Sequence, residues 1–577
     1  MLSRHLAAFR KFAPSKEWRP SAILLRMKMR QQNQFAWTRV LTLAVMFVCV
    51  SDSTCAQANY RVAGIVVNEA DGAPLGRTRV TLAEVQDRRK AESVITGEDG
   101  RFEFRNVPAG KFSLEGARRN FLLTTYQWHE GFSTAIVTGS GLETENLVLR
   151  MVPFGSISGK VIDEAGEPVR NARMKLYMQN RQFGQNRVVR YGYAITGDDG
   201  RYEFSELIPA DYFVSAAARP WYAVYPGWVD ENGVRTRVDT VAAELNVAYA
   251  TTYFNGATEA EAATPISVEK GERVIADIHF NPLPALHVTV KMQGNPADGT
   301  AVWPTLEKME FDNPEPVNLD MVPGANPGEM EINGVPQGRY AIGQPSTSGR
   351  VGANGPVELA EDGQLLESQP SESAGTVKVK LKTARGEDVL QGLNLSLRNE
   401  HRRAIAFVPV SANGEAVFEG VPPGKYAVLV NVSKPPQYTI GRMTIQGTEV
   451  EGHDITVGEG STVEINATLM AGLVSVEGVV KKNGKPASGV MVALVPKDPR
   501  AHIERFRRDQ SDLDGTFMVG GILPGRYTLI AVEDAWGFAW MKPGVLEKYL
   551  AHGQELTIGE LMNGRVTLPD PVEAQLR

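Results

Sequence analysis

Short stretches in which polar and apolar residues alternate recur along the chain after residue 59. Residues 101–104 (RFEF), 274–280 (VIADIHF) and 463–469 (VEINATL) each place an apolar side chain at every second position. This period of two is typical of a β-strand with one face buried. Long amphipathic helical patterns are not found in the same region. The sequence therefore predicts an all-β chain.

A turn of the form V-P-x-G-[KR]-[YF] repeats along the chain. Clear copies lie at residues 107–112, 335–340 and 421–426, and degraded copies lie at 208–213 and 522–527. The final aromatic residues of these turns are separated by 86 to 127 residues. This spacing is too long for a solenoid repeat and suits tandem domains.

A second turn precedes four of these copies. It contains Asp-Gly or Asn-Gly at residues 99–100, 199–200, 413–414 and 514–515, while the third copy has the weaker Asn-Pro-Gly at 326–328. Asp-Gly and Asn-Gly readily adopt the positive φ angles of tight hairpin turns. Each copy therefore predicts a hairpin followed by a turn.

Several short strands within roughly 90–130 residues, with closely spaced turns, indicate a β-sandwich. We predict five tandem β-sandwiches, the second with an aromatic insertion and the third divergent in sequence. Their predicted boundaries are residues 59–152, 153–283, 284–373, 374–472 and 473–577.

The first 58 residues differ from the rest of the chain. Residues 40–50 (VLTLAVMFVCV) are almost wholly apolar, follow basic residues, and precede Ala56-Gln57-Ala58. This order is typical of a secretory signal peptide cleaved after Ala56 or Ala58. The apolar run is shorter than the roughly 20 residues that span a membrane. A retained anchor and a buried core segment are the less favoured alternatives.

The predicted leader over residues 1–58 is long and basic. Initiation at Met27 or Met29 would give a signal peptide of more usual length. Removal of the leader would also remove both cysteines of the chain, Cys49 and Cys55, so the mature protein would contain no disulfide or thiol nucleophile. The remainder would carry a net charge of −13 instead of −6, which does not favour binding to nucleic acid.

The motifs together resemble a known family. The order G-x-V-x-[DN], G-x-P, D-G-R-[FY]-x-F and P-A-G-K-[FY] is similar to the carboxypeptidase regulatory-like domain. The resemblance implies transthyretin-like (prealbumin-like) Greek-key sandwiches of seven strands, often grouped with carbohydrate-binding-like folds. It extends in pieces over nearly all of residues 59–577, and the third unit matches mainly at 335–340. A signal peptide followed by such repeats is similar to large secreted bacterial proteins.

The sequence offers no catalytic constellation. The H-x-x-E pair of His552 and Glu555 has no later histidine that could complete a zinc site. The motifs H-E-x-x-H, G-x-S-x-G and the P-loop are absent. Acidic turns such as 198–200 lack the twelve-residue ligand series of a calcium loop. We therefore predict no catalytic residue, no metal site, no cofactor and no enzymatic activity.

Clustered aromatic residues are the remaining candidates for a ligand site. Indole and phenol rings stack on sugars and peptides, but they also fill cores and domain junctions, and both alternatives stay open. The candidates are Trp221, Tyr222, Tyr225 and Trp228 in the insertion of the second unit, and Trp536 and Trp540 in the fifth.

These observations favour a non-enzymatic exported protein that binds carbohydrate or another extracellular or envelope ligand. A structural spacer or protein-docking scaffold is one alternative, and an accessory fragment of a peptidase system is another. The expected partner is a polysaccharide or an envelope protein, and the mature chain is expected to have no membrane span. Whether the protein is periplasmic, surface-bound or secreted, and its oligomeric state, are left open.

Overall fold

The computed structural model describes residues 59–577 with short gaps. The gaps are residues 140, 183–184, 226, 232–233, 239, 292–304, 312, 318–319, 325, 327, 344–352, 368–373, 384–391, 400–403, 432–436, 451, 500–501, 503–504, 538–543 and 560–561. The described residues belong to one compact unit, Ala58–Arg577. The predicted signal peptide, its cleavage site and the start at Met27 or Met29 lie outside the described residues.

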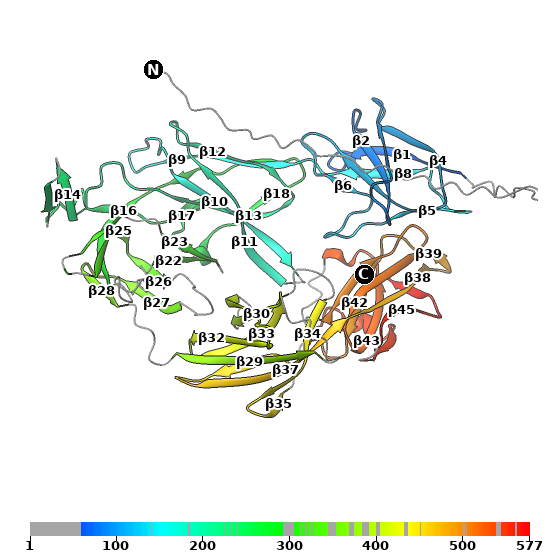
Figure 1. The fold of residues 1–577 in the computed structure, drawn as a ribbon. Helices are drawn as coiled ribbons and strands as arrows, with labels where there is room; N and C mark the ends of the chain where they lie inside the picture. The colour runs from blue at the N-terminus through cyan, green and yellow to red at the C-terminus, as the bar shows by residue number, and fades with distance from the viewer. Residues whose placement is uncertain are drawn as a thin grey trace, which may run out of the picture. The chain divides into compact units, whose positions relative to one another are not determined.

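The N-terminal sandwich consists of two sheets that enclose one core (Figure 1). One sheet has the order β4-β1-β8, with β1 and β8 parallel, and contains β1 (Tyr60–Asn68), β4 (Arg101–Val107) and β8 (Leu147–Met151). The other has the order β3-β2-β5-β6, with β7 also paired to β5. Its strands are β2 (Arg79–Glu84), β3 (Ala91–Ile95), β5 (Gly110–Ala117), β6 (Thr124–Thr125) and β7 (Ile136–Thr138).

The next part of the chain repeats this plan. One sheet contains β9 (Gly155–Ile162), β12 (Arg201–Leu207), β19 (Arg273–Ile275) and β20 (Ile278–His279). The other contains β10 (Arg173–Gln182), β11 (Gln185–Ile195), β13 (Ala210–Ala217), β17 (Thr252–Tyr253) and β18 (Ile266–Val268). The insertion adds the hairpin β14 (Gly227–Glu231) and β15 (Val234–Val238), and two 3-10 turns follow, η1 (Phe254–Gly256) and η2 (Ala260–Ala262).

The third pair of sheets includes a strand from the preceding insertion. This strand is β16 (Val247–Tyr249), which pairs antiparallel with β21 (Pro282–Lys291). The same sheet contains β24 (Asp320–Pro323), β25 (Glu329–Pro336) and β28 (Gln364–Glu367). The opposite sheet contains β22 (Thr305–Glu310), β23 (Asn313–Pro316), β26 (Gly338–Gly343) and β27 (Ala353–Leu359). The insertion therefore links the second and third parts of the fold.

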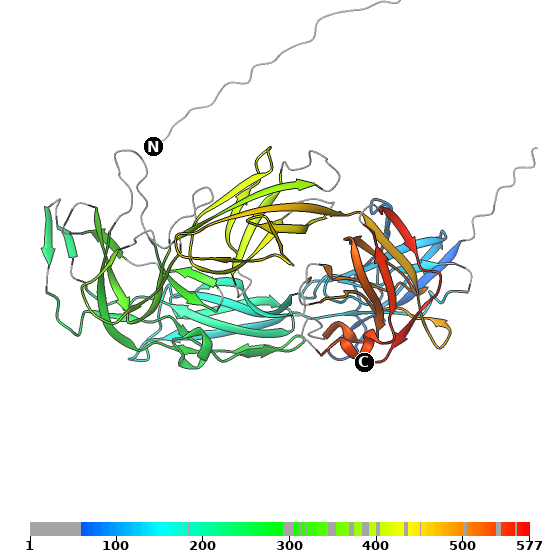
Figure 2. The same ribbon diagram turned by 90° about the horizontal axis from the view of Figure 1, so that it is seen from below.

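The fourth part follows the same architecture, whereas the strands of the fifth are connected through β46 (Val572–Gln575) into one nine-stranded sheet (Figure 2). One sheet of the fourth part contains β29 (Gly375–Thr383), β32 (Glu415–Val421), β34 (Gln437–Ile445), β35 (Thr448–Val450) and β37 (Thr462–Gly472). Its other sheet contains β30 (Asn394–Asn399), β31 (Ala404–Pro409), β33 (Gly424–Asn431) and β36 (Asp454–Val457). The fifth contains β38 (Val474–Lys482), β39 (Lys485–Pro486), β40 (Met491–Pro496), β41 (Arg507–Gln510), β42 (Thr516–Ile522), β43 (Gly525–Val532), β44 (Gln554–Ile558), β45 (Gly564–Thr567) and β46 (Val572–Gln575). Its helical segments are η5 (Ala535–Gly537) and α2 (Glu547–Leu550).

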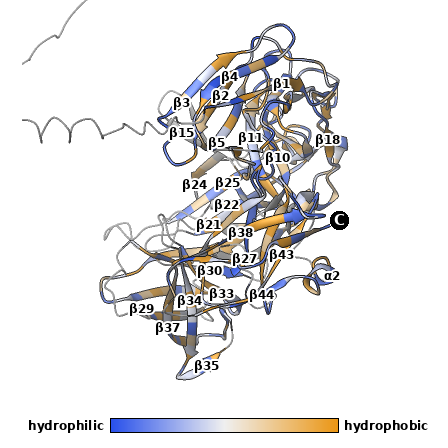
Figure 3. Cartoon of the chain, turned by 90° about the vertical axis from the view of Figure 1, so that its right-hand side faces the viewer, coloured by the Kyte–Doolittle hydropathy of each residue, from blue (hydrophilic) through white to orange (hydrophobic). Residues whose placement is uncertain are grey.

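The all-β prediction is confirmed, since the described residues lie mostly in strands and the helical segments are short. Apolar residues alternate with polar ones along the strands, as the colours of Figure 3 show. In the described residues, six apolar cores span Val62–Met151, Ile157–Phe280, Leu286–Leu366, Val377–Leu469, Val474–Val572 and Met491–Tyr549, the last two within the same part of the chain. The number of domains and their boundaries stay a prediction, because a core does not define where a domain ends. Among the described residues, no helix is long and apolar enough to cross a membrane.

The repeated turns have a physical explanation. Gly100 has a φ of 72°, and a Cβ there would lie 2.6 Å from the carbonyl oxygen of Val66. Gly200 has a φ of 73°, and a Cβ there would lie 2.6 Å from the carbonyl oxygen of Val161. Each Asp-Gly turn therefore requires glycine both for its backbone angle and for close packing against the first strand of its sandwich.

The final aromatic of the V-P-x-G turn closes it by a hydrogen bond. The hydroxyls of Tyr340, Tyr426 and Tyr527 each donate to the carbonyl oxygen four residues earlier, at 2.7 to 2.8 Å. In the second unit Tyr212 makes this bond to Ile208 at 2.7 Å, whereas the sequence pattern had placed Phe213 at the equivalent position. The pattern was therefore misaligned by one residue in this degraded copy.

Candidate functional site

Trp221 is the most exposed of the described aromatic candidates. It follows β13, and 82% of the residue is accessible to solvent. The ring of Tyr222 lies beside it, with centroids 5.7 Å apart and planes at 83°. Because the two rings are nearly perpendicular, they do not form one flat platform. Trp221 therefore presents a single indole to solvent.

The segment that carries Trp221 is fixed by Glu164 in the turn after β9. The hydroxyl of Tyr222 donates to one carboxylate oxygen of Glu164, and the hydroxyl of Tyr249 donates to the other at 2.7 Å. The hydrogen bond to Glu164 and partial burial raise the pKa of Tyr222 to about 12. Burial alone would raise the pKa of Glu164, but the two hydroxyls hold it below its usual value. Glu164 therefore holds the segment as a carboxylate.

Tyr225 lies at the junction between the second and third sandwiches. Its hydroxyl donates to the carbonyl oxygen of Val247 at 3.1 Å, and the guanidinium of Arg219 lies 4.3 Å from the ring centroid. A Cβ on Gly334 of β25 would lie 2.4 Å from this ring. The ring of Tyr225 therefore packs closely against the third sandwich. This agrees with the alternative that the clustered aromatic residues fill domain junctions.

Trp228 and Trp540 give less information. The backbone of Trp228 lies in β14, opposite Arg237 of β15. Its side chain and the whole of Trp540 lie outside the described residues. The prediction that they contact a ligand therefore stays untested.

Trp536 is buried between the first and fifth sandwiches, with 6% of the residue exposed. Its indole stacks on the imidazole of His129, with centroids 5.2 Å apart and an interplanar angle of 5°. Phe132 contacts it from the same sandwich as His129, at 5.4 Å. Trp536 therefore packs a domain junction and is not accessible to a ligand in this structure.

The same junction contains a network of polar contacts. Gln510 donates through Nε2 to the carbonyl oxygen of Gln127 at 2.6 Å and to the hydroxyl of Thr134 at 2.8 Å, and its Oε1 lies 3.0 Å from Nδ1 of His129. Lys111 pairs with Asp512 at 2.6 Å. Two sandwiches that are far apart in the sequence are thus held together by directed hydrogen bonds.

A second network joins the second and third sandwiches. Glu310 is 2% exposed and accepts a hydrogen bond from Lys175 at 2.8 Å and another from the hydroxyl of Tyr177 at 2.5 Å. Burial and the adjacent carboxylates raise the pKa of Tyr177 far above its usual value, so it acts as a donor. Phe311 lies among aromatic rings of the second sandwich, 4.7 Å from that of Phe213. The hairpin β22–β23 is therefore packed against the sheet of the second sandwich that contains β10 and β13.

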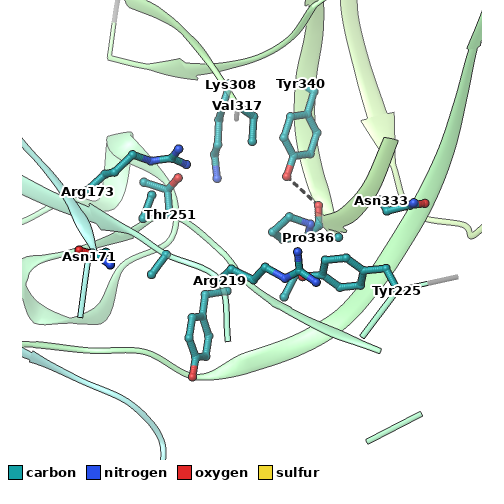
Figure 4. A pocket seen from close by; sticks show the side chains of 15 residues that line it. Asn171, Arg173, Arg219, Tyr225, Thr251, Lys308, Val317, Asn333, Pro336 and Tyr340 are labelled. Carbon is teal, nitrogen blue, oxygen red and sulfur yellow. Dashed lines mark hydrogen bonds between the residues drawn. The ribbon is translucent and has the colours of Figure 1, made fainter. Parts of the chain in front are cut away.

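A cavity of about 230 Å³ lies beside this network, between the second and third sandwiches (Figure 4). Fifteen residues line it, and none of them is acidic. The charged and aromatic side chains in its wall include Arg173, Arg219, Lys308, Tyr225 and Tyr340. The cavity is therefore a concavity with a basic, partly aromatic wall.

Sequence reasoning did not identify this cavity. Tyr225 was singled out as an aromatic candidate, but the basic residues Arg173, Arg219 and Lys308 were not. They come from three separate segments, and no local motif connects them. In the described part of the chain, no group of three or more His, Cys, Asp or Glu side chains is placed to hold a metal ion.

Comparison of the chain with known proteins gives a match to one protein family. No curated protein sequence matches the chain. Among solved structures, the Bacillus anthracis TIE protein is 14% identical, over 75% of this chain and 78% of that one, with a TM-score of 0.17. The minor pilin GBS52 of Streptococcus agalactiae is 13% identical, over 39% and 97%, with a TM-score of 0.20. The major pilin subunit BcpA of Bacillus cereus is 12% identical, over 55% and 99%, with a TM-score of 0.12.

These TM-scores are too low to support any conclusion about function. The family match is more specific, because residues 61–141 fit the model described as the carboxypeptidase regulatory-like domain. The matched residues contain the first Asp-Gly turn and the first V-P-x-G turn, the motifs that carry the sequence resemblance. Residues 61–141 therefore match the carboxypeptidase regulatory-like domain, within a chain of tandem β-sandwiches.

Proposed function

We propose that this chain is a non-enzymatic, exported protein of five β-sandwiches that binds carbohydrate through Trp221. Export would follow from the signal peptide predicted over residues 1–58, and N-terminal sequencing of the mature protein would test its removal. The observation that carries the ligand proposal is the 82% exposure of Trp221 on a segment that Glu164 holds in place.

Two physical arguments support a role for Trp221. The indole of Trp221 is 82% exposed, so a ligand can reach its face without any rearrangement of the chain. An indole face also stacks well on the apolar face of a sugar ring, while its N–H remains able to hydrogen-bond. Because Tyr222 and Tyr249 fix the segment through Glu164, little conformational entropy would be lost on binding.

The test is a depletion assay of residues 59–577 against a panel of immobilised polysaccharides. We expect wild-type protein to be depleted by at least one polysaccharide and Trp221→Ala to remain in solution. Trp128→Ala is the matched control, since Trp128 is another exposed tryptophan, 42% accessible, in the first sandwich. The proposal is wrong if no polysaccharide depletes the wild type, or if Trp221→Ala is depleted equally.

A protein-docking scaffold is the second candidate function. It is favoured by the two polar junctions, at Gln510 and at Glu310, which hold sandwiches together and give the chain preassembled surfaces. Cross-linking in envelope extracts tests this function. A specific envelope protein captured without any polysaccharide binding would favour the scaffold over the carbohydrate proposal.

A further inference from the structure

We infer that the cavity between the second and third sandwiches binds a small oxyanion about the size of one sugar unit, of the class of sugar acids and sugar phosphates. This site is separate from the surface around Trp221, and the inference does not depend on carbohydrate binding there. It is carried by the charge of the cavity wall and by the size of the cavity.

The charge of the wall favours an anion. Figure 4 shows the charged ends of Arg173 and Lys308 directed toward the same space. Lys308 is 5% exposed, and its Nζ donates to the carbonyl oxygen of Thr258 at 2.8 Å and contacts Glu259 at 3.2 Å. Within the described residues, Arg173 forms no ion pair. Since Glu259 can offset only one positive charge, the cavity keeps an excess of positive charge.

Arg219 adds a positioned donor to the same wall. Its guanidinium lies over the ring of Tyr225, 4.3 Å from the centroid, and donates to the carbonyl oxygen of Ala223 at 3.0 Å. A guanidinium held by stacking loses less entropy when it binds a carboxylate or phosphate than one that is free to rotate. The cavity therefore presents a preorganised cationic surface.

The size and walls of the cavity limit the ligand to about one sugar unit. Its volume of about 230 Å³ is below the range of roughly 300–1,000 Å³ that accommodates drug-sized ligands. Tyr340 contributes an aromatic wall, and its hydroxyl is already engaged by the carbonyl oxygen of Pro336 at 2.7 Å. Tyr225 packs on Gly334 and closes another side. The ligand would therefore be a monosaccharide-sized anion.

The test is calorimetric titration of residues 59–577 with glucuronate, glucose 1-phosphate and glucose at low ionic strength. We expect one or both anions to bind, glucose to bind much more weakly, and added NaCl to reduce the affinity. The anion that binds identifies carboxylate or phosphate as the source. Arg173→Gln should weaken binding about 10- to 100-fold, because one charge-assisted contact is lost.

Two control variants keep the result interpretable. Arg201→Gln removes an arginine of the opposite sheet, paired with Asp199, and should leave anion binding unchanged. Trp221→Ala should also leave it unchanged, which separates this site from the proposed carbohydrate surface. The inference is overturned if no anion binds up to about 10 mM. It is also overturned if glucose binds as tightly as the anions, or if Arg173→Gln, folded as judged by circular dichroism, binds like wild type.

Discussion

The contact between the first and fifth sandwiches depends on Gln510, which is 2% exposed. Its amide makes three contacts to the first sandwich: to the carbonyl of Gln127, to the hydroxyl of Thr134, and to the imidazole of His129. Gln510→Leu keeps a similar volume and removes all three. We expect this variant to loosen the junction while both sandwiches remain folded.

The magnitude follows from the groups left unpaired. The substitution leaves two buried hydrogen-bonding partners, the Gln127 carbonyl and the Thr134 hydroxyl, without their amide, at about 1–3 kcal/mol each. Allowing for partial rearrangement, opening the junction should become easier by about 3 kcal/mol. This corresponds to an opening equilibrium about 100-fold more favourable.

Hydrogen exchange reports this opening directly. Two backbone amides donate across the junction, that of Ala135 to Oδ1 of Asp512 at 2.9 Å and that of Leu513 to the carbonyl of Ala135 at 3.1 Å. Both should exchange about 100-fold faster in Gln510→Leu. Gln554→Leu is the matched control, since the Gln554 amide bonds within the fifth sandwich, to Pro571. Unchanged exchange at both amides in Gln510→Leu would refute the reasoning.

Two further substitutions give results with a definite sign. Burial raises the pKa of Asp509 to about 6. Between about pH 4 and pH 6 the folded state therefore keeps the proton of this carboxyl group, while the unfolded state loses it. The free energy of unfolding should therefore fall as pH rises through that window. Asp509→Asn should remove this fall, which amounts to at most about 3 kcal/mol. The test is to measure the urea midpoint of both proteins from pH 4 to pH 7. The assignment is wrong if the midpoint of Asp509→Asn depends on pH as strongly as that of the wild type. Gly334→Ala places a Cβ against the ring of Tyr225 at a φ of 73° and should destabilise the protein by about 2–4 kcal/mol. Gly328→Ala, with a φ of 83° and open space around it, should cost about 1 kcal/mol, and equal melting temperatures for the two variants would contradict the packing at Gly334.

Local features of the fold were predictable from the sequence because they depend on neighbouring residues. The alternation of apolar residues predicted strands, and the Asp-Gly turns marked sites such as Gly100 and Gly200, where the backbone requires glycine. The one-residue misalignment at Tyr212 arose because adjacent aromatics, Tyr212 and Phe213, both fit the pattern. Phe213 packs against Phe311 of another sandwich, which no local pattern reveals.

The junctions and the cavity were not predictable in this way. Lys111 and Asp512 are separated by 401 residues, and Lys175 and Glu310 by 135. Charged residues of this kind are ordinary on strand surfaces, so nothing in the sequence distinguishes those that pair across a junction. For the same reason Trp536, which was a candidate for ligand contact, could be recognised as a junction residue only after its stacking on His129 was known.

The central claim is that Trp221 contacts the carbohydrate. Isothermal titration with an oligosaccharide of the polysaccharide selected by the depletion assay tests it most directly. The account predicts that Trp221→Ala binds about 30-fold more weakly or worse, as expected for an aromatic residue that dominates binding, while Trp128→Ala binds like wild type. Equal affinities of the wild type and Trp221→Ala would contradict the claim.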